Sequence, residues 1–231
     1  MLIEKYLATL SSSTWFAEIP KNLQQALLSK VRLRHLKANQ RLHARGEEGI
    51  GFYGICDGRI KVTYIAANGK EMLFALLGPG TWFGEISLFD GLPRTHDSVC
   101  EIDTVIALIP KASFNELLKL HPDLYPYFAK LLCSRVRSAF QFIDSSAGLS
   151  LKHQLIKRLL MLTTSYGQHL PTDRAITVTL SQESLAQMIN SSRQTVNQLL
   201  GELEHADLIK RHYGKITIID SNALFSELSD V

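Results

Sequence analysis

The amino-acid sequence predicts an α+β fold of two domains joined by a long helix. Short apolar runs separated by turn residues predict an antiparallel β domain over residues 41–109. After residue 121, apolar residues that recur at steps of three and four predict the long helix. Two short helices and a strand pair complete the pattern. We therefore expect a β-rich domain over 1–121, a long helix and hinge over 122–147, and a last domain over 148–231.

Size and composition are those of a globular protein with more than one core. The chain has 231 residues and a mass of 25.9 kDa, and 45% of its residues are hydrophobic and 20% charged. These values exclude a peptide, a small cross-linked scaffold and a disordered chain. The net charge of +3 is too small to indicate a partner by itself.

The cysteines and the N-terminus predict a cytoplasmic protein. Cys56, Cys100 and Cys133 lie far apart and form no metal-ligand pattern, so we expect reduced, buried thiols. The N-terminus has no basic segment followed by an apolar one, and no apolar run reaches the roughly 18 residues of a transmembrane helix. We therefore expect no membrane partner.

The β domain follows a short helix expected over residues 23–28. Its apolar runs have the sequences FYGI, IKVTYI, MLFALL and TVIALI, and Gly, Pro, Asn and Asp residues separate them. This spacing predicts an antiparallel sandwich or roll. The strongest hairpin signal is Asn68 with Gly69, between the second and third runs, because Asn-Gly adopts the tight turns that join twisted strands.

A short helix after Pro110 precedes the long helix, whose first turn accommodates Pro122. The long helix packs its apolar seam either on the β domain of its own chain or on the same helix of a second subunit. Its position between two domains favours the second arrangement, a homodimer. Residues 144–150 are the expected hinge. The seam consists of Leu124, Phe128, Leu131 or Leu132, Val136, Ala139 and Ile143.

The segment after the hinge has the layout of a winged helix. A helix is followed by a strand over 175–180, two short helices and a strand pair around 212–215. The apolar face of the first helix comprises Leu155, Ile156, Leu159, Leu160 and Leu162.

Residues 180–200 fit two helices that cross at a sharp angle. Such a crossing needs a small residue at the contact, a turn residue that tolerates positive φ and a buried branched residue. Ala186, Asn190 and Val196 occupy these places. Serines can cap both helices: Ser181 caps the first, and either Ser191, in a capping box with Gln194, or Ser192 caps the second.

The second of these helices carries side chains whose donors and acceptors fit base edges in the major groove. Arg193 is the best candidate for a guanine contact. The strand pair adds basic residues that would lie along phosphates as a wing. We expect binding to double-stranded DNA; the alternative is a solvated helix and hairpin that bind nothing. The candidate DNA-binding residues are Ser192, Arg193, Gln194, Asn197, Gln198, Lys210, Arg211 and Lys215.

A loop in the β domain has the composition of a ligand site. Residues 84–96 combine a glycine, the Glu85 carboxylate and the Arg94 guanidinium. Backbone N–H groups with an arginine suit a phosphate, and a carboxylate suits paired sugar hydroxyls. The alternative is a surface turn with a structural ion pair between Glu85 and Arg94.

These motifs resemble the CRP/FNR superfamily of bacterial transcription regulators, the family of the cyclic AMP receptor protein, from about residue 33 to residue 219. The segments RGEE, YGICDGRI, GKEM and GTWFGE look like the glycine framework of the family's β-roll. GEISLFDGLPRT looks like its phosphate-binding cassette, and SSRQTVNQLL like its recognition helix. The resemblance implies a cyclic-nucleotide-binding-type β-roll (a jelly roll), a long dimerisation helix and a C-terminal winged helix-turn-helix.

The resemblance also implies roles for residues and partners. Gly84 and Glu85 would hold a ribose, and Arg94 and Thr95 a cyclic phosphate. The protein would be a homodimer that binds operator DNA and acts on RNA polymerase. In the family, the ligand repositions the long helix and with it two recognition helices, which must lie about 34 Å apart.

Three features depart from the cyclic AMP receptor protein. Ala139 and Phe140 stand where that protein has the Thr-Ser pair that reaches the adenine, and His96 stands where the family usually has a small residue. Gln194 and Gln198 replace a Glu and an Arg, so we expect a different operator. We expect the effector to be a cyclic nucleotide, and these departures leave open whether it is cyclic AMP. The alternative is the same fold with a vestigial or non-nucleotide pocket.

Other cofactors are not expected. The FNR branch holds an iron–sulfur cluster through N-terminal cysteines, and the first 55 residues contain none. Haem is not expected because an isolated histidine is more often structural than an axial ligand. A metal enzyme of cupin type would need histidines and a carboxylate at close spacing, so we expect no enzyme. The histidines considered as haem ligands are His35, His43, His96, His121 and His153.

Overall fold

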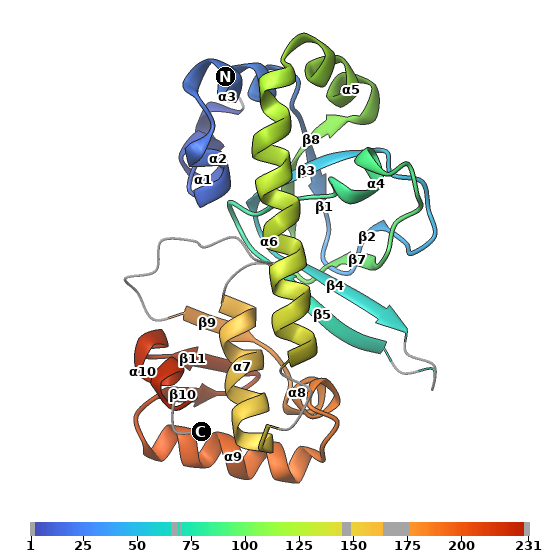
Figure 1. Cartoon of the computed structure of the whole chain (residues 1–231). Helices are drawn as coiled ribbons and strands as arrows, with labels where there is room; N and C mark the ends of the chain where they lie inside the picture. The colour runs from blue at the N-terminus through green and yellow to red at the C-terminus, as the bar shows by residue number, and fades with distance from the viewer. Residues whose placement is uncertain (1–2, 66–68, 70, 145–148, 164–175, 229–231) are drawn as a thin grey trace. The chain divides into compact units, whose positions relative to one another are not determined.

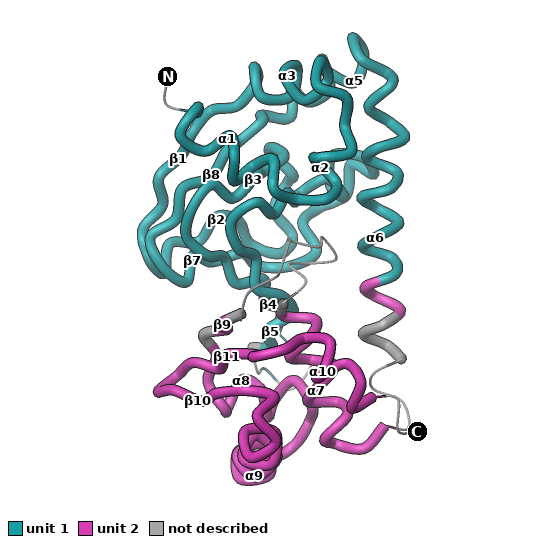
Figure 2. The backbone as a smooth tube through the Cα atoms, turned by 90° about the vertical axis from the view of Figure 1, so that its left-hand side faces the viewer, with its two compact units in different colours: residues 1–137, 165–171 teal, residues 138–164, 172–231 magenta. Residues whose placement is uncertain are grey.

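The computed structural model describes residues 3–65, 69, 71–144, 149–163 and 176–228, and Figure 1 shows its helices and strands. The described residues divide into two compact units (Figure 2). The first unit extends to Arg137 and the second begins at Ser138, so the division falls within helix α6 (Tyr125–Asp144).

Short helices open the first unit, and the sequence predicted only the last of them. Ser13 starts the α2 helix by accepting a hydrogen bond from the backbone N–H of Phe16 at 3.1 Å. These elements are the 3₁₀ turn η1 (Glu4–Tyr6), α1 (Leu7–Leu10), α2 (Thr14–Glu18) and α3 (Lys21–Ser29).

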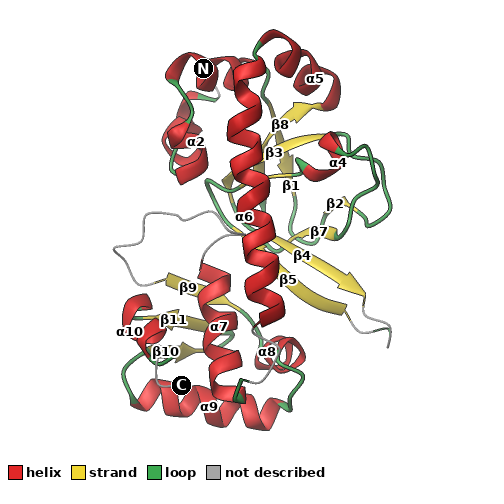
Figure 3. Cartoon of the chain, viewed as in Figure 1, coloured by secondary structure: helices red, strands yellow, loops and turns green. Residues whose placement is uncertain are grey.

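Two four-stranded antiparallel sheets follow, in the orders β1-β8-β3-β6 and β2-β7-β4-β5. Figure 3 shows the strands of both sheets in yellow. Apolar side chains from both sheets share one core, which confirms the predicted roll. β4 pairs with β5, as the hairpin pattern predicted, although residues 66–68 and 70 of the turn lie outside the described residues. The strands are β1 (Arg32–Leu36), β2 (Arg41–His43), β3 (Gly51–Asp57), β4 (Ile60–Ile65), β5 (Glu71–Leu77), β6 (Trp82–Phe83), β7 (Asp97–Cys100) and β8 (Thr104–Pro110).

A second core, rich in aromatic rings, joins the N-terminal helices, the roll and α6. The Trp82 ring stacks on Phe16 with 5.2 Å between centroids, and its Nε1 donates to the carbonyl of Leu10 at 3.0 Å. Trp15 Nε1 donates to the carbonyl of Tyr127 on α6 at 2.7 Å. Leu10, Trp15, Phe16 and Ile19 are thus part of the folded core of this unit.

The predicted seam of the long helix proves to be two adjacent faces. Leu124, Phe128 and Leu131 are at most 1% exposed and pack on the first unit, whereas Val136 is 50% exposed. The prediction that these residues form one seam was wrong. Two rows of residues on neighbouring faces of a helix can both show steps of three and four, so the spacing alone does not tell them apart. The helices here are α4 (Ile86–Phe89), α5 (Lys111–Leu120), the 3₁₀ turn η2 (Pro122–Leu124) and α6.

The cysteines are free, and two of them are buried as predicted. Burial raises the pKa of the Cys56 thiol to about 12. Cys133 is exposed on α6, so the prediction of a buried thiol is wrong for this residue. It follows Leu132 on the face that does not pack on the first unit.

The second unit has the predicted layout of a winged helix, with a three-stranded sheet in the order β10-β11-β9. The hinge residues 145–148 lie outside the described residues. A short last helix was not predicted. Among the described residues, no helix has the length and hydropathy to span a membrane. The elements are α7 (Leu151–Thr163), β9 (Ile176–Thr179), α8 (Gln182–Met188), α9 (Arg193–His205), β10 (Ile209–His212), β11 (Lys215–Ile218) and α10 (Ser221–Ser226).

Candidate functional site

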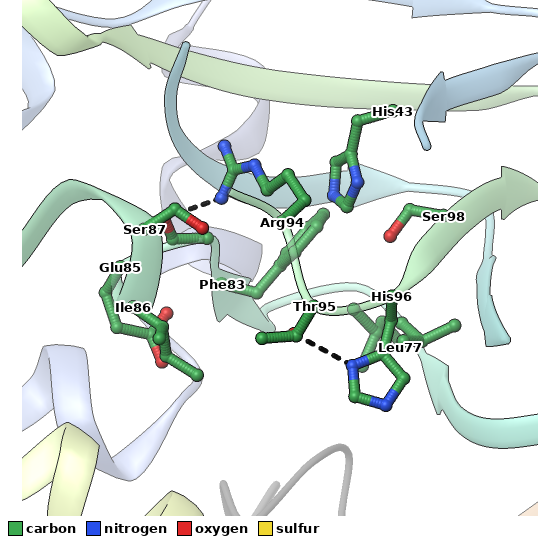
Figure 4. A pocket seen from close by; sticks show the side chains of 12 residues that line it. His43, Leu77, Phe83, Glu85, Ile86, Ser87, Arg94, Thr95, His96 and Ser98 are labelled. Carbon is green, nitrogen blue, oxygen red and sulfur yellow. Dashed lines mark hydrogen bonds between the residues drawn. The ribbon is translucent and has the colours of Figure 1, made fainter. Parts of the chain in front are cut away.

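The first unit contains an open pocket beside α4, with about 420 Å³ of space. This volume includes open solvent at the mouth of the pocket. All four candidate ligand residues line it, together with two histidines (Figure 4). The lining residues are His43, Val62, Leu77, Phe83, Gly84, Glu85, Ile86, Ser87, Arg94, Thr95, His96 and Ser98.

Gly84 places the backbone of the pocket loop where another residue would not fit. Its φ is +96°, in the region that favours glycine. A Cβ at this position would lie 3.0 Å from Arg94 Nη1 and 3.1 Å from the carbonyl oxygen of Gly51. Both the backbone conformation and the available space therefore require a glycine.

The carboxylate of Glu85 is buried, with one oxygen paired and one not. Oε1 accepts from Arg135 Nε at 2.9 Å in an ion pair whose side chains are 1% and 5% exposed, respectively. Arg135 Nη2 also donates to the carbonyl of Trp82 at 2.7 Å. Among the described residues, Glu85 Oε2 has no hydrogen-bond partner. A buried acceptor in this state can accept a hydrogen bond from a ligand in the pocket.

The Arg94 guanidinium supports the pocket loop from inside. Nη1 donates to the carbonyl of Gly84 and Nη2 to that of Gly51, both at 2.8 Å. The guanidinium carbon lies 5.3 Å from the centroid of the Tyr53 ring. The alternative ion pair between Glu85 and Arg94 is therefore wrong: Glu85 pairs with Arg135, and Arg94 binds backbone carbonyls.

Thr95, which is exposed, and His96, which is half-buried, form the end of the loop. His96 Nδ1 lies 2.8 Å from Thr95 Oγ1 (Figure 4). The imidazole ring stacks on Phe74 with 4.5 Å between centroids. Burial, and then the positive charge of Arg45, lower the pKa of His96. A neutral ring at pH 7 can donate or accept a hydrogen bond here.

His43 is the most perturbed titratable group of the pocket. Its side chain lies beside Arg94, is 8% exposed, and leaves Nδ1 buried without a partner among the described residues (Figure 4). Burial, followed by the positive charge of Arg94, lowers the pKa of His43 from 6.5 to about 4, while Glu47 and Asp97 raise it by less. The ring is therefore neutral at pH 7.

The sequence interpretation missed Arg135 and assigned His43 only as an unlikely haem ligand. Arg135 follows Leu131 by four residues, so it continues the buried face of α6. An arginine in that row is the signal that could have identified it, because a buried charge requires a partner. No group of three or more metal-binding side chains occurs among the residues that the structure describes.

In the second unit, α8 and α9 form the predicted helix-turn-helix. Ala186 and Val196 are buried, and Asn190 has a φ of +49° between the helices. Ser181 accepts from the N–H of Ser184 at 3.0 Å, as expected of a cap. Ser192 caps α9 in the same way, by accepting from Thr195 N–H at 3.0 Å. The capping box of Ser191 and Gln194 was wrong because α9 begins at Arg193.

The candidate base-reading residues share an exposed surface of α9 but differ in their contacts. Ser192, Arg193, Gln194, Asn197 and Gln198 are all exposed. Asn197 Oδ1 accepts a hydrogen bond from Gln182 Nε2 on α8 at 3.0 Å. Arg193 and Gln194 have no side-chain hydrogen bond or ion pair within the described residues, and can reach outward.

The wing residues lie on two faces of the strand pair. Lys210 and Lys215 are exposed. Arg211 lies on the opposite face of β10 from Lys210, because neighbouring residues of a strand alternate. Its Nε donates to Glu204 Oε2 on α9 at 2.6 Å. The sequence pattern grouped Arg211 with Lys210 and Lys215 as DNA-binding residues, but in the structure Arg211 is paired with Glu204, and it lies on the other face of the strand from Lys210.

Comparisons with known proteins agree with this architecture. The chain matches the cyclic nucleotide-binding domain over residues 33–121 and the Crp-like helix-turn-helix domain over residues 153–226. It is 28% identical over 181 residues to the CRP-like cAMP-activated global transcriptional regulator of Mycobacterium tuberculosis, covering 78% of this chain and 81% of that protein. It is 28% identical over 186 residues to the global nitrogen regulator of Synechocystis, covering 80% and 83%.

Solved structures share the fold. A CRP/FNR-family transcriptional regulator of Thermus thermophilus is similar with a TM-score of 0.62 and 25% identity, covering 86% of this chain and 99% of that one. The c-di-GMP-responsive global regulator of Xanthomonas campestris is similar with a TM-score of 0.65 and 15% identity, covering 87% and 100%.

A β-roll of the cyclic-nucleotide-binding type followed by a helix-turn-helix defines a DNA-binding transcription regulator. The chain belongs to the CRP/FNR superfamily, as the sequence motifs predicted.

Proposed function

We propose that the protein is a homodimeric, cytoplasmic transcription regulator whose operator binding is controlled by a cyclic nucleotide in the pocket of the first unit. Arg193, Gln194 and Gln198 read bases in this proposal, and Lys210 and Lys215 bind phosphates. The bound dimer acts on RNA polymerase.

The observation that carries the effector proposal is the unpartnered oxygen of Glu85. A carboxylate oxygen accepts hydrogen bonds from hydroxyls, and the ribose of a 3′,5′-cyclic nucleotide has one free hydroxyl, on the 2′ carbon. Thr95 Oγ1, on the same pocket, can donate its hydrogen to the phosphate while it accepts from His96 Nδ1. Because Oε1 is paired with Arg135 on α6, the side chain of Glu85 would link a ligand bound at Oε2 to that helix.

A second candidate is the same regulator with a non-nucleotide or vestigial pocket. Arg94 favours this candidate, since both of its Nη groups already donate to backbone carbonyls. These bonds fix the guanidinium in place, so a phosphate would have to reach its remaining N–H groups, including Nε, which has no partner among the described residues. The relatives also differ: one is named as cAMP-activated and another as a nitrogen regulator.

Calorimetric titration of the full chain with cyclic AMP, cyclic GMP and c-di-GMP decides between the candidates. We expect one of the three to bind, and Thr95→Val to weaken its binding about tenfold through loss of a hydrogen bond to the phosphate. Leu92→Ala is the matched control, because Leu92 is 62% exposed on the same loop and does not line the pocket. Absence of heat with all three nucleotides, together with unchanged DNA binding, would remove the cyclic nucleotide proposal.

The homodimer proposal rests on the exposed apolar face of α6. Residues 129, 132, 136 and 139 are spaced three and four apart, which is the a/d pattern of a two-stranded coiled coil. Val136 is 50% exposed, and Phe140, next to this row, is 59% exposed. Apolar side chains of this size in a row on one helix are typical of an interface. The face is separate from the buried face that packs on the first unit.

Val136→Glu is expected to convert the dimer to a monomer, because it places a charge at the centre of the row. Light scattering should give twice 25.9 kDa for the unchanged protein and 25.9 kDa for the variant. A short bifunctional maleimide should join two chains through Cys133, and Cys133→Ser should abolish the product because the other thiols are buried. Arg137→Glu, one residue outside the row, should remain a dimer. A monomer in the unchanged protein contradicts the proposal.

A further inference from the structure

A hydrogen-bonded cluster connects the wing to the recognition helix α9. Glu204 Oε2 accepts from Arg211 Nε at 2.6 Å, and Glu204 Oε1 accepts from the backbone N–H of Arg211 at 2.7 Å. One carboxylate therefore fixes both the side chain and the backbone of the same wing residue. These charge-assisted bonds are stronger than neutral ones.

Asn197 is tied into the same cluster. Its Oδ1 accepts from Arg211 Nη1 at 3.0 Å and from Gln182 Nε2 on α8 at 3.0 Å. Arg211 Nη1 also lies 3.3 Å from the backbone carbonyl of Asn197, to which it donates. The side chain of Asn197 thus joins α8, α9 and the wing.

The surface of α9 leaves room for the guanidinium of Arg211. Asn197, Gly201 and Glu204 are four and three residues apart, so they lie on one face of α9. A Cβ at Gly201 would lie 3.8 Å from Arg211 Nη2, an ordinary van der Waals contact, and would meet no other atom within 4 Å outside the adjacent residues and the backbone of α9. The absence of a side chain between Asn197 and Glu204 leaves this face open to Arg211.

These contacts occupy some of the groups that DNA recognition would need. An asparagine that reads adenine uses its oxygen and its nitrogen together, and two donors already occupy Asn197 Oδ1. A phosphate contact needs a positive charge, and Glu204 compensates that of Arg211. The bonds from Arg211 hold the pKa of Glu204 below its ordinary value, so its carboxylate stays charged at neutral pH.

We propose that Asn197, Glu204 and Arg211 are positioning residues that hold the wing against α9, and that none of the three reads a base or binds a phosphate. We call these three residues the clasp. Sequence recognition then falls to Arg193, Gln194 and Gln198, and the clasp sets the affinity for every DNA sequence alike. The inference uses the DNA-binding activity of the family and does not depend on any effector.

The salt dependence of DNA binding separates positioning from phosphate contact. Full-length protein is titrated with a random-sequence duplex at a series of salt concentrations. Arg211→Gln should lower affinity about tenfold at every concentration and leave the slope of log K against log salt unchanged. Lys210→Gln and Lys215→Gln are the matched controls, and each should reduce the slope by about 1. A reduced slope for Arg211→Gln overturns the proposal.

Base readout is tested on a duplex selected from a random pool and on its single base-pair variants. Asn197→Ala should weaken binding to all of them by the same factor. Arg193→Ala, the control for readout, should lose about 10- to 100-fold in preference at one base pair only. A loss of preference confined to one base pair in Asn197→Ala would contradict a positioning role.

Hydrogen exchange in the protein without DNA gives a readout of wing order. Exchange of the wing over residues 209–218 should quicken in Asn197→Ala and Arg211→Gln, and stay unchanged in Lys210→Gln. The double variant Glu204→Arg with Arg211→Glu, which restores opposite charges, should recover part of the lost DNA affinity. Unchanged exchange in both single variants, or no recovery in the double variant, overturns the clasp.

Discussion

Arg135→Ala is expected to lower the free energy of unfolding of the first unit by about 3–5 kcal/mol. The substitution removes the only cation paired with the buried carboxylate of Glu85 within the described residues. It also leaves the carbonyl of Trp82 without the bond from Arg135 Nη2. A buried charge without a partner is among the few changes that cost this much.

Tryptophan fluorescence during urea denaturation measures this effect in the first unit alone. The chain has two tryptophans, Trp15 and Trp82, and both lie in the aromatic core of that unit. Arg137→Ala, two residues further along α6 and exposed, is the control and should change stability by less than about 0.5 kcal/mol. If Arg135→Ala were as stable as this control, the ion pair would have no part in holding the pocket.

A double variant tests whether the pair acts as a unit. Glu85→Gln with Arg135→Met removes both charges and keeps side chains of similar length. Replacing a buried pair by neutral groups is often nearly neutral, so the double variant should be more stable than Arg135→Ala alone. Equal losses in the two would show that the unpaired carboxylate is not the source of the cost.

Acidification is expected to destabilise the first unit through His43. Its pKa is about 4 in the folded protein and 6.5 when unperturbed, so between these values the unfolded chain binds the proton and the folded chain does not. Stability therefore falls as pH decreases from 6.5 toward 4, and the difference amounts to about 3 kcal/mol in full. Above pH 6.5 neither state is protonated, and this contribution is constant.

His43→Gln isolates the contribution of this ring. Urea denaturation at pH 7.5 and at pH 4.5, followed by tryptophan fluorescence, gives the loss of stability for each protein. Between pH 7.5 and pH 4.5, the free energy of unfolding of the variant should fall by about 2–3 kcal/mol less than that of the unchanged protein. This difference does not depend on how stable the variant is at pH 7.5. His96→Gln should give a smaller change of the same sign, because burial lowers that pKa as well. The same loss in His43→Gln and the unchanged protein would show that His43 is not the group responsible.

Patterns local in sequence predicted most of the architecture. The alternation of apolar runs and turn residues located β3, β4, β5 and β8, and the helix-turn-helix followed from Ala186, Asn190 and Val196. These features are set by backbone conformation and by residues a few positions apart. The candidate ligand residues also came together in one pocket, because one short loop carries them.

Contacts between distant residues could not be predicted in this way. Arg135 pairs with Glu85 across 50 positions, and no local pattern links an arginine on a helix to a carboxylate on a loop. Arg211 was grouped with Lys210 by charge, but strand alternation directs it to Glu204. The two faces of α6 could be separated only when the structure showed which row packs on the roll.

The N-terminal helices show that the region recognised by similarity is smaller than the region that folds together. The match to the cyclic nucleotide-binding domain begins at residue 33, whereas Leu10, Trp15 and Phe16 lie earlier and complete the aromatic core. Cutting the chain at that match would uncover the face of the Trp82 ring that stacks on Phe16 and remove the hydrogen bond from Trp15 to the Tyr127 carbonyl. The cooperative folding unit therefore starts inside the first 10 residues, and homology alone would place its boundary too late.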